Sequence, residues 1–364
     1  MLNICICGGG SQGHISAGVI GSNSNYNVNI LTRKPDLWAH DFKTVDLDGK
    51  EYLAKLDVIT NNPAEIIPKV DIVLICLPGY AICEELQKIK PYIKENTIIG
   101  SVFGGSGFFL DVQKVIGKDV KAFALQRVPY TGRPLEYGHS ARLKGYKPYL
   151  KVASINIADQ DAIVRLLQDW YTTPVYKLSH YLEATLSNSN PLLHPCRLYV
   201  LFKDWTPNTV YKNIPFLYGD DWDDESSALW VACDDELSNI ISHLPINKQE
   251  VPTVLEYYGC ENVKQLTAKM RSIVPFKGVQ PHMIEVEGGY KLDNHHRYFI
   301  EDIPYGLVLI KSFAELVHVD TPNIDKVIYW AQSLMEKEYL VNGKLTGKDM
   351  NEACVIGDIK LLNL

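Results

Sequence analysis

The sequence lacks any long apolar run. None of its apolar stretches reaches the roughly 18 to 20 residues that a membrane-spanning helix needs, so we expect no membrane association. The chain also lacks the basic start and cleavage site of a signal peptide, because its first residues already form a strand-like apolar segment. These two absences predict a cytoplasmic protein.

An excess of basic charge is also missing. Lys and Arg number 36 against 43 Asp and Glu, and this mildly acidic balance argues against nucleic-acid binding. The eight cysteines do not have zinc-ligand spacing, and the pair His295-His296 has no third ligand at a suitable spacing. We therefore predict no metal site, and we interpret the cysteines as reduced thiols.

The strongest motif lies at the start of the chain. The strand-like segment Leu2–Cys7 runs into a glycine-rich turn with the spacing G-x-G-x-x-G, and Ile15–Ile20 can continue as a helix. This order is typical of a dinucleotide site, in which the glycines allow a tight turn, room for the pyrophosphate and close helix–strand packing. The predicted cofactor-binding glycines are Gly8, Gly9, Gly10 and Gly13. The other interpretation is a glycine-rich turn without a ligand. We assign no chemistry to His14, which follows the motif.

The length and the pattern predict two domains. The chain has 364 residues, of which 46% are hydrophobic, and this is enough for two full cores. Strand and helix patterns alternate up to about residue 180, and helical periods follow. We predict an α/β Rossmann domain at residues 1–180 and a mainly α-helical domain at residues 181–364.

The end of the second predicted strand bears on the choice of cofactor. Asn27–Leu31 is followed by Thr32, Arg33 and Lys34, where a site for NAD would normally place an acidic residue. A hydroxyl followed by two cations suits the extra phosphate of NADP. We predict that these three residues contact NADP. NAD as the cofactor, and an ordinary basic turn, are the alternatives.

Two residues of the second domain are candidates for proton transfer. His194 precedes a proline, and Asp302 lies more than a hundred residues later in the chain. A catalytic histidine needs a carboxylate to fix its tautomer and to stabilise its cationic form. The residues alone do not show that these two meet.

Several segments resemble the octopine dehydrogenase family. Arg297–Gly306 is similar to the family element R-Y-x-x-E-D-I-P-x-G. The other matching segments are Cys7–Gly10, His194-Pro195, Trp330–Gln332, Lys337–Val341 and Leu345–Asp349, so the resemblance covers nearly the whole chain. It implies an opine dehydrogenase, in which an amino acid condenses with a 2-oxo acid and NAD(P)H reduces the imine to a secondary amine dicarboxylate.

The resemblance also implies roles for four residues. His194 and Asp302 correspond to the catalytic pair, and Arg297 corresponds to an arginine that reaches the cofactor phosphates. Val128–Arg133 is similar to the family's L-P-W-A-C-R loop but differs at three residues, and Arg133 is a candidate anchor for a substrate carboxylate. A structural salt bridge for Arg297 and a domain-packing role for Arg133 are the alternatives.

Two other functions stay open at this point. One is a simple 2-oxo acid or alcohol dehydrogenase on the same fold, and the other is a cofactor-binding protein without turnover. The expected partners are small-molecule substrates, an amino acid and a 2-oxo acid. Their identities are not encoded in any motif, because specificity depends on pocket shape. Whether the chain forms a homodimer is equally open.

Overall fold

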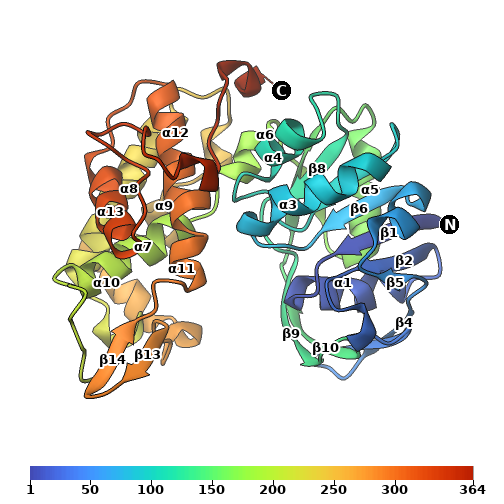
Figure 1. Cartoon of the computed structure of the whole chain (residues 1–364), viewed down its shortest axis with the longest axis horizontal. Coiled ribbons are helices and arrows are strands. Elements are labelled where there is room, and N and C mark those ends of the chain that lie inside the picture. Colours follow the sequence, from blue (N-terminus) through green and yellow to red (C-terminus); the bar gives the residue numbers. More distant parts are fainter. Residues whose placement is uncertain (364) are drawn as a thin grey trace. The chain divides into compact units, whose positions relative to one another are not determined.

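The structure is a computed structural model that describes residues 1–363, and it divides into two compact units (Figure 1). The first unit is Met1–Asn188 and the second is Ser189–Asn363. The predicted boundary at residue 180 lies eight residues earlier, because the short helix α6 (Tyr181–Thr185) belongs to the first unit. The predicted end of the second domain, residue 364, lies outside the described residues. Among residues 1–363, no helix is long and apolar enough to cross a bilayer.

An eight-stranded sheet forms the centre of the first unit, in the order β12-β11-β8-β7-β6-β1-β2-β5. Its strands are β1 Leu2–Cys7, β2 Tyr26–Leu31, β5 Ile59–Thr60, β6 Ile72–Ile75, β7 Ile98–Ser101, β8 Ala122–Leu125, β11 Leu150–Ile155 and β12 Val175–Lys177. Neighbouring strands are parallel, except for β8 and β11. Because β1 lies between β2 and β6, the strand order reverses at β1. Ligands of such sheets bind beyond the carboxyl end of the strand at this point.

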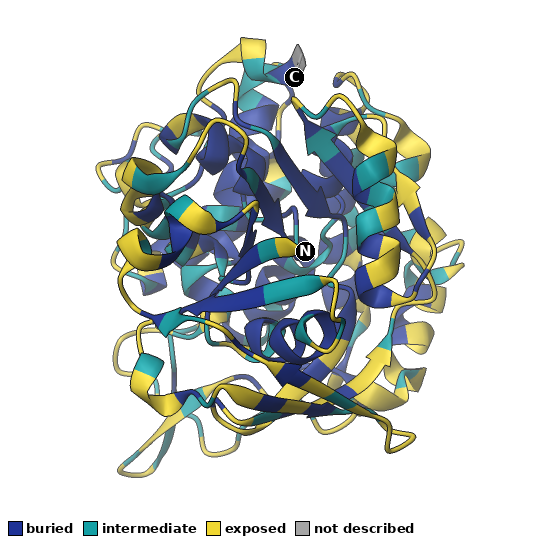
Figure 2. Ribbon diagram, turned by 90° about the vertical axis from the view of Figure 1, so that its right-hand side faces the viewer, coloured by how far each residue is buried: buried dark blue, intermediate teal, exposed yellow. Residues whose placement is uncertain are grey.

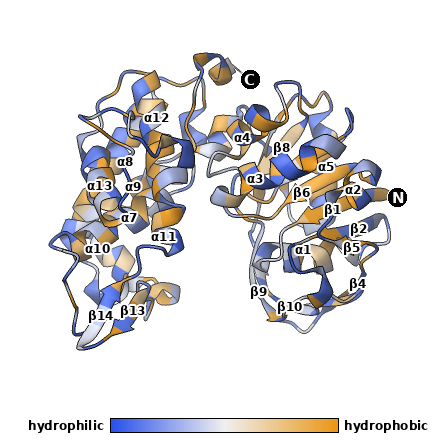
Figure 3. Ribbon diagram, viewed as in Figure 1, coloured by the Kyte–Doolittle hydropathy of each residue, from blue (hydrophilic) through white to orange (hydrophobic). Residues whose placement is uncertain are grey.

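Helices cover this sheet and bury its apolar strands. They are α1 Ser11–Gly21, α2 Pro63–Ile66, α3 Gly79–Ile89, α4 Phe108–Val115, α5 Gln160–Tyr171 and α6. The four residues of β6 are all buried, as expected of a continuous apolar run in a parallel sheet. Figure 2 shows the strands mostly in the buried colour, and Figure 3 shows that they are also the hydrophobic part of this unit.

A second, four-stranded sheet packs against α1, and the sequence pattern does not predict it. Its order is β4-β3-β10-β9. The strands are β3 Asp41–Val45, β4 Glu51–Lys55, β9 Tyr130–Glu136 and β10 Ser140–Tyr146. Tyr130, Ala141 and Leu143 are buried in the same hydrophobic core as Ile15 of α1. This sheet therefore extends the core of the first unit around α1.

The second unit is mainly helical, as predicted. Its helices are α7 Asn190–Phe202, α8 Asp224–Ile241, α9 Val254–Tyr258, α10 Val263–Ser272, α11 Arg297–Ile300, a π-helix at Ile303–Leu307, α12 Val308–Leu316 and α13 Pro322–Leu334. A hairpin of β13 Met283–Val286 and β14 Gly289–Leu292 is added to them. The fully buried Arg197 of α7 donates hydrogen bonds to the carbonyl oxygens of Leu217 and Asp221, which fixes the segment before α8.

Asp111, in the first turn of α4, gives the first unit a pH-dependent stability. Burial raises the pKa of its carboxyl from 3.8 to about 7. The folded state therefore holds the proton more tightly than the unfolded chain, and stability falls as the pH rises from about 4 to about 7. We expect Asp111→Asn to raise the free energy of unfolding by roughly 1–4 kcal/mol at pH 8 and by less at pH 5. Urea unfolding at both pH values tests this, and an equal gain at both would contradict it.

Candidate active site

The glycine-rich loop follows β1 and needs two of its glycines for steric reasons. Gly8 has φ +124°, and a Cβ on it would lie 2.6 Å from the carbonyl oxygen of Cys76. A Cβ on Gly13 would lie 1.9 Å from the carbonyl oxygen of Gly8. Gly10, the N-cap of α1, differs, because a Cβ there would meet no atom within 4 Å. The space next to the Cα of Gly10, on the outer side of the loop, is therefore not filled by other atoms of the protein.

This open space fits the pyrophosphate of a dinucleotide. The first N–H groups of α1 have no acceptor within the helix, and the helix dipole favours an anion at this end. The loop also follows the strand at which the sheet order reverses. The residues present therefore fit NAD(P), with the four predicted glycines as the ones that would hold its pyrophosphate.

The structure brings the end of β2 to the same loop. β1 and β2 are paired in register up to Cys7 and Leu31, and a Cβ on Gly9 would lie 3.1 Å from Oγ1 of the buried Thr32. Arg33 and Lys34 follow with exposed side chains. Neither forms an ion pair with any residue in the described range 1–363. Two unpaired cations thus follow the strand that receives the adenosine ribose in this fold.

Arg133 lies on β9, whose residues alternate between buried and exposed. The buried side of the strand faces α1, and there the hydroxyl of Tyr130 bonds to Ser16 and donates to the carbonyl oxygen of Gln12. Arg133 is on the exposed side, opposite Arg142 of β10. Its guanidinium has no ion-pair partner among residues 1–363. The structure therefore leaves the guanidinium of Arg133 available to an anion, and its role as a carboxylate anchor stays a prediction.

His194 and Asp302 meet inside the second unit. Nδ1 of His194 lies 2.8 Å from Oδ2 of Asp302, and the two side chains are 11% and 6% exposed. With Nδ1–H donating to the carboxylate, Nε2 carries the lone pair that can accept a proton. Nε2 has no hydrogen-bond partner among the described residues 1–363. The arrangement is that of a general acid–base histidine oriented by a carboxylate.

Local features of the two helical segments bring the pair together. Pro195 lies inside α7 and has no N–H, so the turn around His194 lacks one helical hydrogen bond. Asp302 precedes the π-helix, and its carbonyl oxygen accepts a wide-turn hydrogen bond from Leu307. A Cβ on Gly306 would lie 2.5 Å from Cβ of Pro191, so α7 and the π-helix approach each other closely only because residue 306 is glycine.

Tyr298 is a site residue that the sequence analysis missed. Its ring centroid lies 4.3 Å from that of His194, and burial raises the pKa of its phenol above the ordinary value of 10.0. The available signal was its position four residues before Asp302, on the same side of a helical segment.

Arg297, next to Tyr298 in the sequence, is exposed and forms no ion pair with residues 1–363. The alternative role of Arg297, a structural salt bridge, therefore finds no partner among residues 1–363, and contact of Arg297 with the cofactor stays a prediction.

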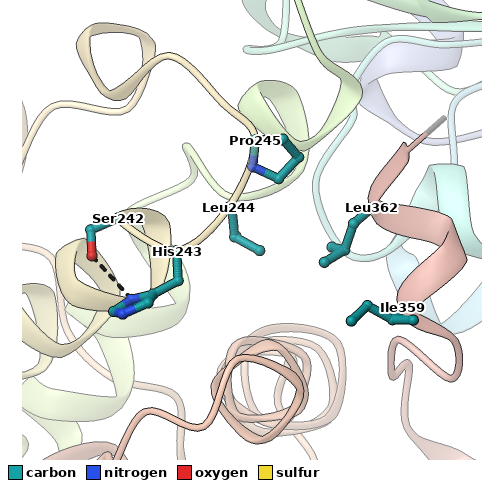
Figure 4. Close-up of a pocket in the computed structure, with 6 residues that line it drawn as sticks. All are labelled: Ser242, His243, Leu244, Pro245, Ile359 and Leu362. Atoms are coloured by element: carbon teal, nitrogen blue, oxygen red, sulfur yellow. Dashed lines mark hydrogen bonds between the residues drawn. The ribbon is translucent and has the colours of Figure 1, made fainter.

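A separate pocket lies within the second unit between the end of α8 and the C-terminal 3-10 helix, Ile359–Asn363 (Figure 4). Its lining residues are Ser242, His243, Leu244, Pro245, Ile359 and Leu362. Ser242 and His243 share a hydrogen bond between Oγ and Nδ1 at 3.1 Å. The lining contains none of the predicted site residues, so we place no chemistry there.

Comparison with known proteins gives matches along the chain. Residues 177–335 match the family described as NAD/NADP octopine/nopaline dehydrogenase, alpha-helical domain, and residues 4–128 match ketopantoate reductase PanE/ApbA. The chain is 29% identical to tauropine dehydrogenase of Arabella iricolor, with 96% of each chain covered. It is 28% identical to octopine dehydrogenase of Mizuhopecten yessoensis, with 96% and 94% covered. A solved structure of octopine dehydrogenase with NADH and L-arginine has a TM-score of 0.85 at 26% identity, covering 97% and 94% of the two chains.

These matches confirm the fold that the sequence predicted, a Rossmann domain followed by a helical domain. They extend over both the glycine loop and the unit that holds the His194–Asp302 pair. The family description matched by residues 177–335 names NAD or NADP, both relatives are dehydrogenases, and the solved structure holds NADH. Residues 177–335 therefore match the helical domain of the octopine dehydrogenase family, and the chain is an NAD(P)-dependent oxidoreductase of the opine dehydrogenase type, which acts on CH–NH groups.

Proposed function

We propose that the chain catalyses the reductive condensation of an amino acid with a 2-oxo acid to a secondary amine dicarboxylate. The observation that carries this proposal is the buried His194–Asp302 pair, with its atoms 2.8 Å apart, in the helical unit that follows a dinucleotide-binding unit. The names of the relatives, tauropine and octopine dehydrogenase, support the same reaction class.

The chemistry accounts for the pair. The amine nitrogen of the amino acid attacks the keto carbon of the 2-oxo acid, and loss of water leaves an imine. The reduced nicotinamide, when bound, supplies a hydride to the imine carbon. His194 then provides the proton that the nitrogen needs, or carries positive charge beside it, while the carboxylate of Asp302 orients the ring and stabilises the imidazolium. In the reverse direction, neutral Nε2 accepts the proton of the secondary amine.

Two arginines complete the proposal. Arg297 is proposed to contact the cofactor phosphates, because it is an exposed cation five residues before Asp302 with no ion-pair partner in the described residues 1–363. Arg133 is proposed to bind a substrate carboxylate, because a guanidinium can hold a carboxylate through two parallel hydrogen bonds.

The test is a turnover assay with two organic substrates. We expect oxidation of NADPH or NADH only when a 2-oxo acid such as pyruvate and an amino acid from a panel are both present. Equal oxidation with the 2-oxo acid alone would favour a simple dehydrogenase instead. Binding of the cofactor without turnover under any combination would favour the binding protein.

We further propose NADP as the preferred cofactor, with Arg33 as the main contact to its 2′-phosphate. Arg33 and Lys34 are exposed and follow Thr32, the first residue after β2. Arg33→Ala should weaken NADPH binding about tenfold or more, because one charge-assisted contact to phosphate is lost, and should change NADH binding little. The measurement is the dissociation constant of each cofactor by nicotinamide fluorescence.

The control for this comparison is Lys90→Ala. Lys90 is an exposed cation of the same unit, at the far end of α3. Lys90→Ala removes one positive charge, as Arg33→Ala does, and should leave the dissociation constants of NADPH and NADH unchanged. Tighter binding of NADH than of NADPH by the unmodified chain would overturn the proposed preference.

We also propose a cytoplasmic location. All eight cysteines are free thiols, and six of them are buried. Free, mostly buried thiols are typical of a reducing compartment. Fractionation of cells that express the chain, followed by detection of the protein, tests this location.

A further inference from the structure

The turn between β9 and β10 lies on the glycine-rich loop. Tyr137 is the first residue after β9, and its side chain is partly exposed. A Cβ placed on Gly9 would lie 2.5 Å from the hydroxyl oxygen of Tyr137, and 3.1 Å from Oγ1 of Thr32. The phenol therefore lies directly over Gly9, beside the end of β2.

The chemistry of Tyr137 suits a ligand at this place. Its hydroxyl has no hydrogen-bond partner within the described residues 1–363. The ammonium of Lys34 lies 5.9 Å from the centroid of its ring. In a doubly wound sheet the adenosine ribose lies at the end of the second strand, so a free hydroxyl between Gly9 and Thr32 is next to the ribose 2′ position.

His14 holds the turn in this position. Its buried ring accepts a hydrogen bond at Nε2 from the backbone N–H of Gly138, at 2.7 Å. Nδ1 therefore carries the hydrogen and donates to the carbonyl oxygen of Gly10, at 3.0 Å. The ring also contacts Tyr137, with centroids 4.8 Å apart. One side chain thus joins the phosphate loop to the turn that carries Tyr137.

The backbone of the turn is fixed from a second side. Gly138 has φ +74°, and a Cβ on it would lie 1.9 Å from the carbonyl oxygen of Leu37. Its own carbonyl oxygen accepts a hydrogen bond from the N–H of Ala39, in the segment that follows β2. Figure 1 shows β9 and β10 beside α1.

We propose that Tyr137 is a cofactor-binding residue whose hydroxyl bonds to the ribose 2′ group of the adenosine half, and that His14 is the positioning residue that holds it there. The 2′ group is a hydroxyl in NADH and a phosphate in NADPH. The proposal rests on the nucleotide binding that the proposed function requires, but it does not depend on which substrates are joined.

The test measures dissociation constants by nicotinamide fluorescence with the full chain and no organic substrate. For Tyr137→Phe we expect binding about 3- to 10-fold weaker for NADH and at least tenfold weaker for NADPH, because a hydrogen bond to a charged group is the stronger one. NADH that lacks the adenosine 2′-hydroxyl should bind equally to the unmodified chain and to Tyr137→Phe. Tyr149→Phe, at an exposed tyrosine of the same unit, is the matched control and should change nothing.

His14→Phe keeps an aromatic ring but loses both hydrogen bonds. As a single variant, His14→Phe should weaken binding of both cofactors. In the Tyr137→Phe background it should weaken their binding little further, because both changes act through one contact. A purely structural role for His14 would give additive losses instead. If the unmodified chain binds NADH and NADPH but Tyr137→Phe changes neither constant more than twofold, the proposal is wrong. If the unmodified chain binds neither, the proposed function has failed first.

Discussion

His194→Asn is expected to lower kcat for the condensation by about 10²- to 10⁴-fold, the usual contribution of a general acid–base group. The dissociation constant of NADPH should stay nearly unchanged, because His194 belongs to the second unit and the glycine loop to the first. Asp302→Asn should lower kcat as well, since it removes the charge that stabilises the imidazolium. The measurement is steady-state turnover at saturating substrates, with cofactor binding determined separately.

The two residues should act as one unit. Nδ1 of His194 and Oδ2 of Asp302 are 2.8 Å apart, so the double variant should lose little more than His194→Asn alone. His243→Asn changes an exposed histidine of the same unit and should retain full activity. Turnover of His194→Asn within tenfold of the unmodified chain would contradict a catalytic role for the pair.

Substitutions in the glycine loop should give the second large effect. Alanine at Gly13 and alanine at Gly10 should differ in their effects on stability and on cofactor binding. Gly13→Ala places a methyl group 1.9 Å from the carbonyl oxygen of Gly8, so α1 must move off β1. We expect a loss of about 3 kcal/mol or more in the free energy of unfolding, together with loss of cofactor binding. Gly10→Ala has no such clash within 4 Å. It should keep the stability but weaken NADPH binding by roughly 100-fold, because the methyl group occupies the space of the pyrophosphate.

Urea unfolding and fluorescence titration of both variants separate these outcomes. Gly357→Ala is the control, because a Cβ on Gly357 also meets no atom within 4 Å and the residue lies in the second unit. It should change neither stability nor binding. A Gly10→Ala variant that binds NADPH as tightly as the unmodified chain would show that the nucleotide does not lie on this loop.

The fold of the first unit followed from local patterns where they were strong. The run that became β6 is apolar at every position, and the glycines after β1 have fixed steric roles, so both were predictable. The four-stranded sheet was not predictable. In β9 a glycine and a proline interrupt the strand pattern, and β3 carries charges on its exposed side. These strands are stabilised by packing against α1. Those contacts join residues that are far apart in the sequence, so no short sequence segment indicates them.

The candidate site depended on information beyond local pattern. His194 and Asp302 are 108 residues apart and no periodicity links them, so the resemblance to a family was the only route to the pair. Tyr298 could have been found from its spacing of four to Asp302. Tyr137 could not, because its place over Gly9 arises from a turn more than a hundred residues away that His14 fixes.

The most direct test of the central claim, that this chain joins an amino acid to a 2-oxo acid through a reduced imine, is the mass of the product. The chain would be incubated with NADPH carrying deuterium at the transferable position, a mixed pool of amino acids and one 2-oxo acid. We predict a product with the summed mass of both acids, less one oxygen atom and with one deuterium bound to carbon. A deuterated 2-hydroxy acid as the sole labelled product would contradict the account.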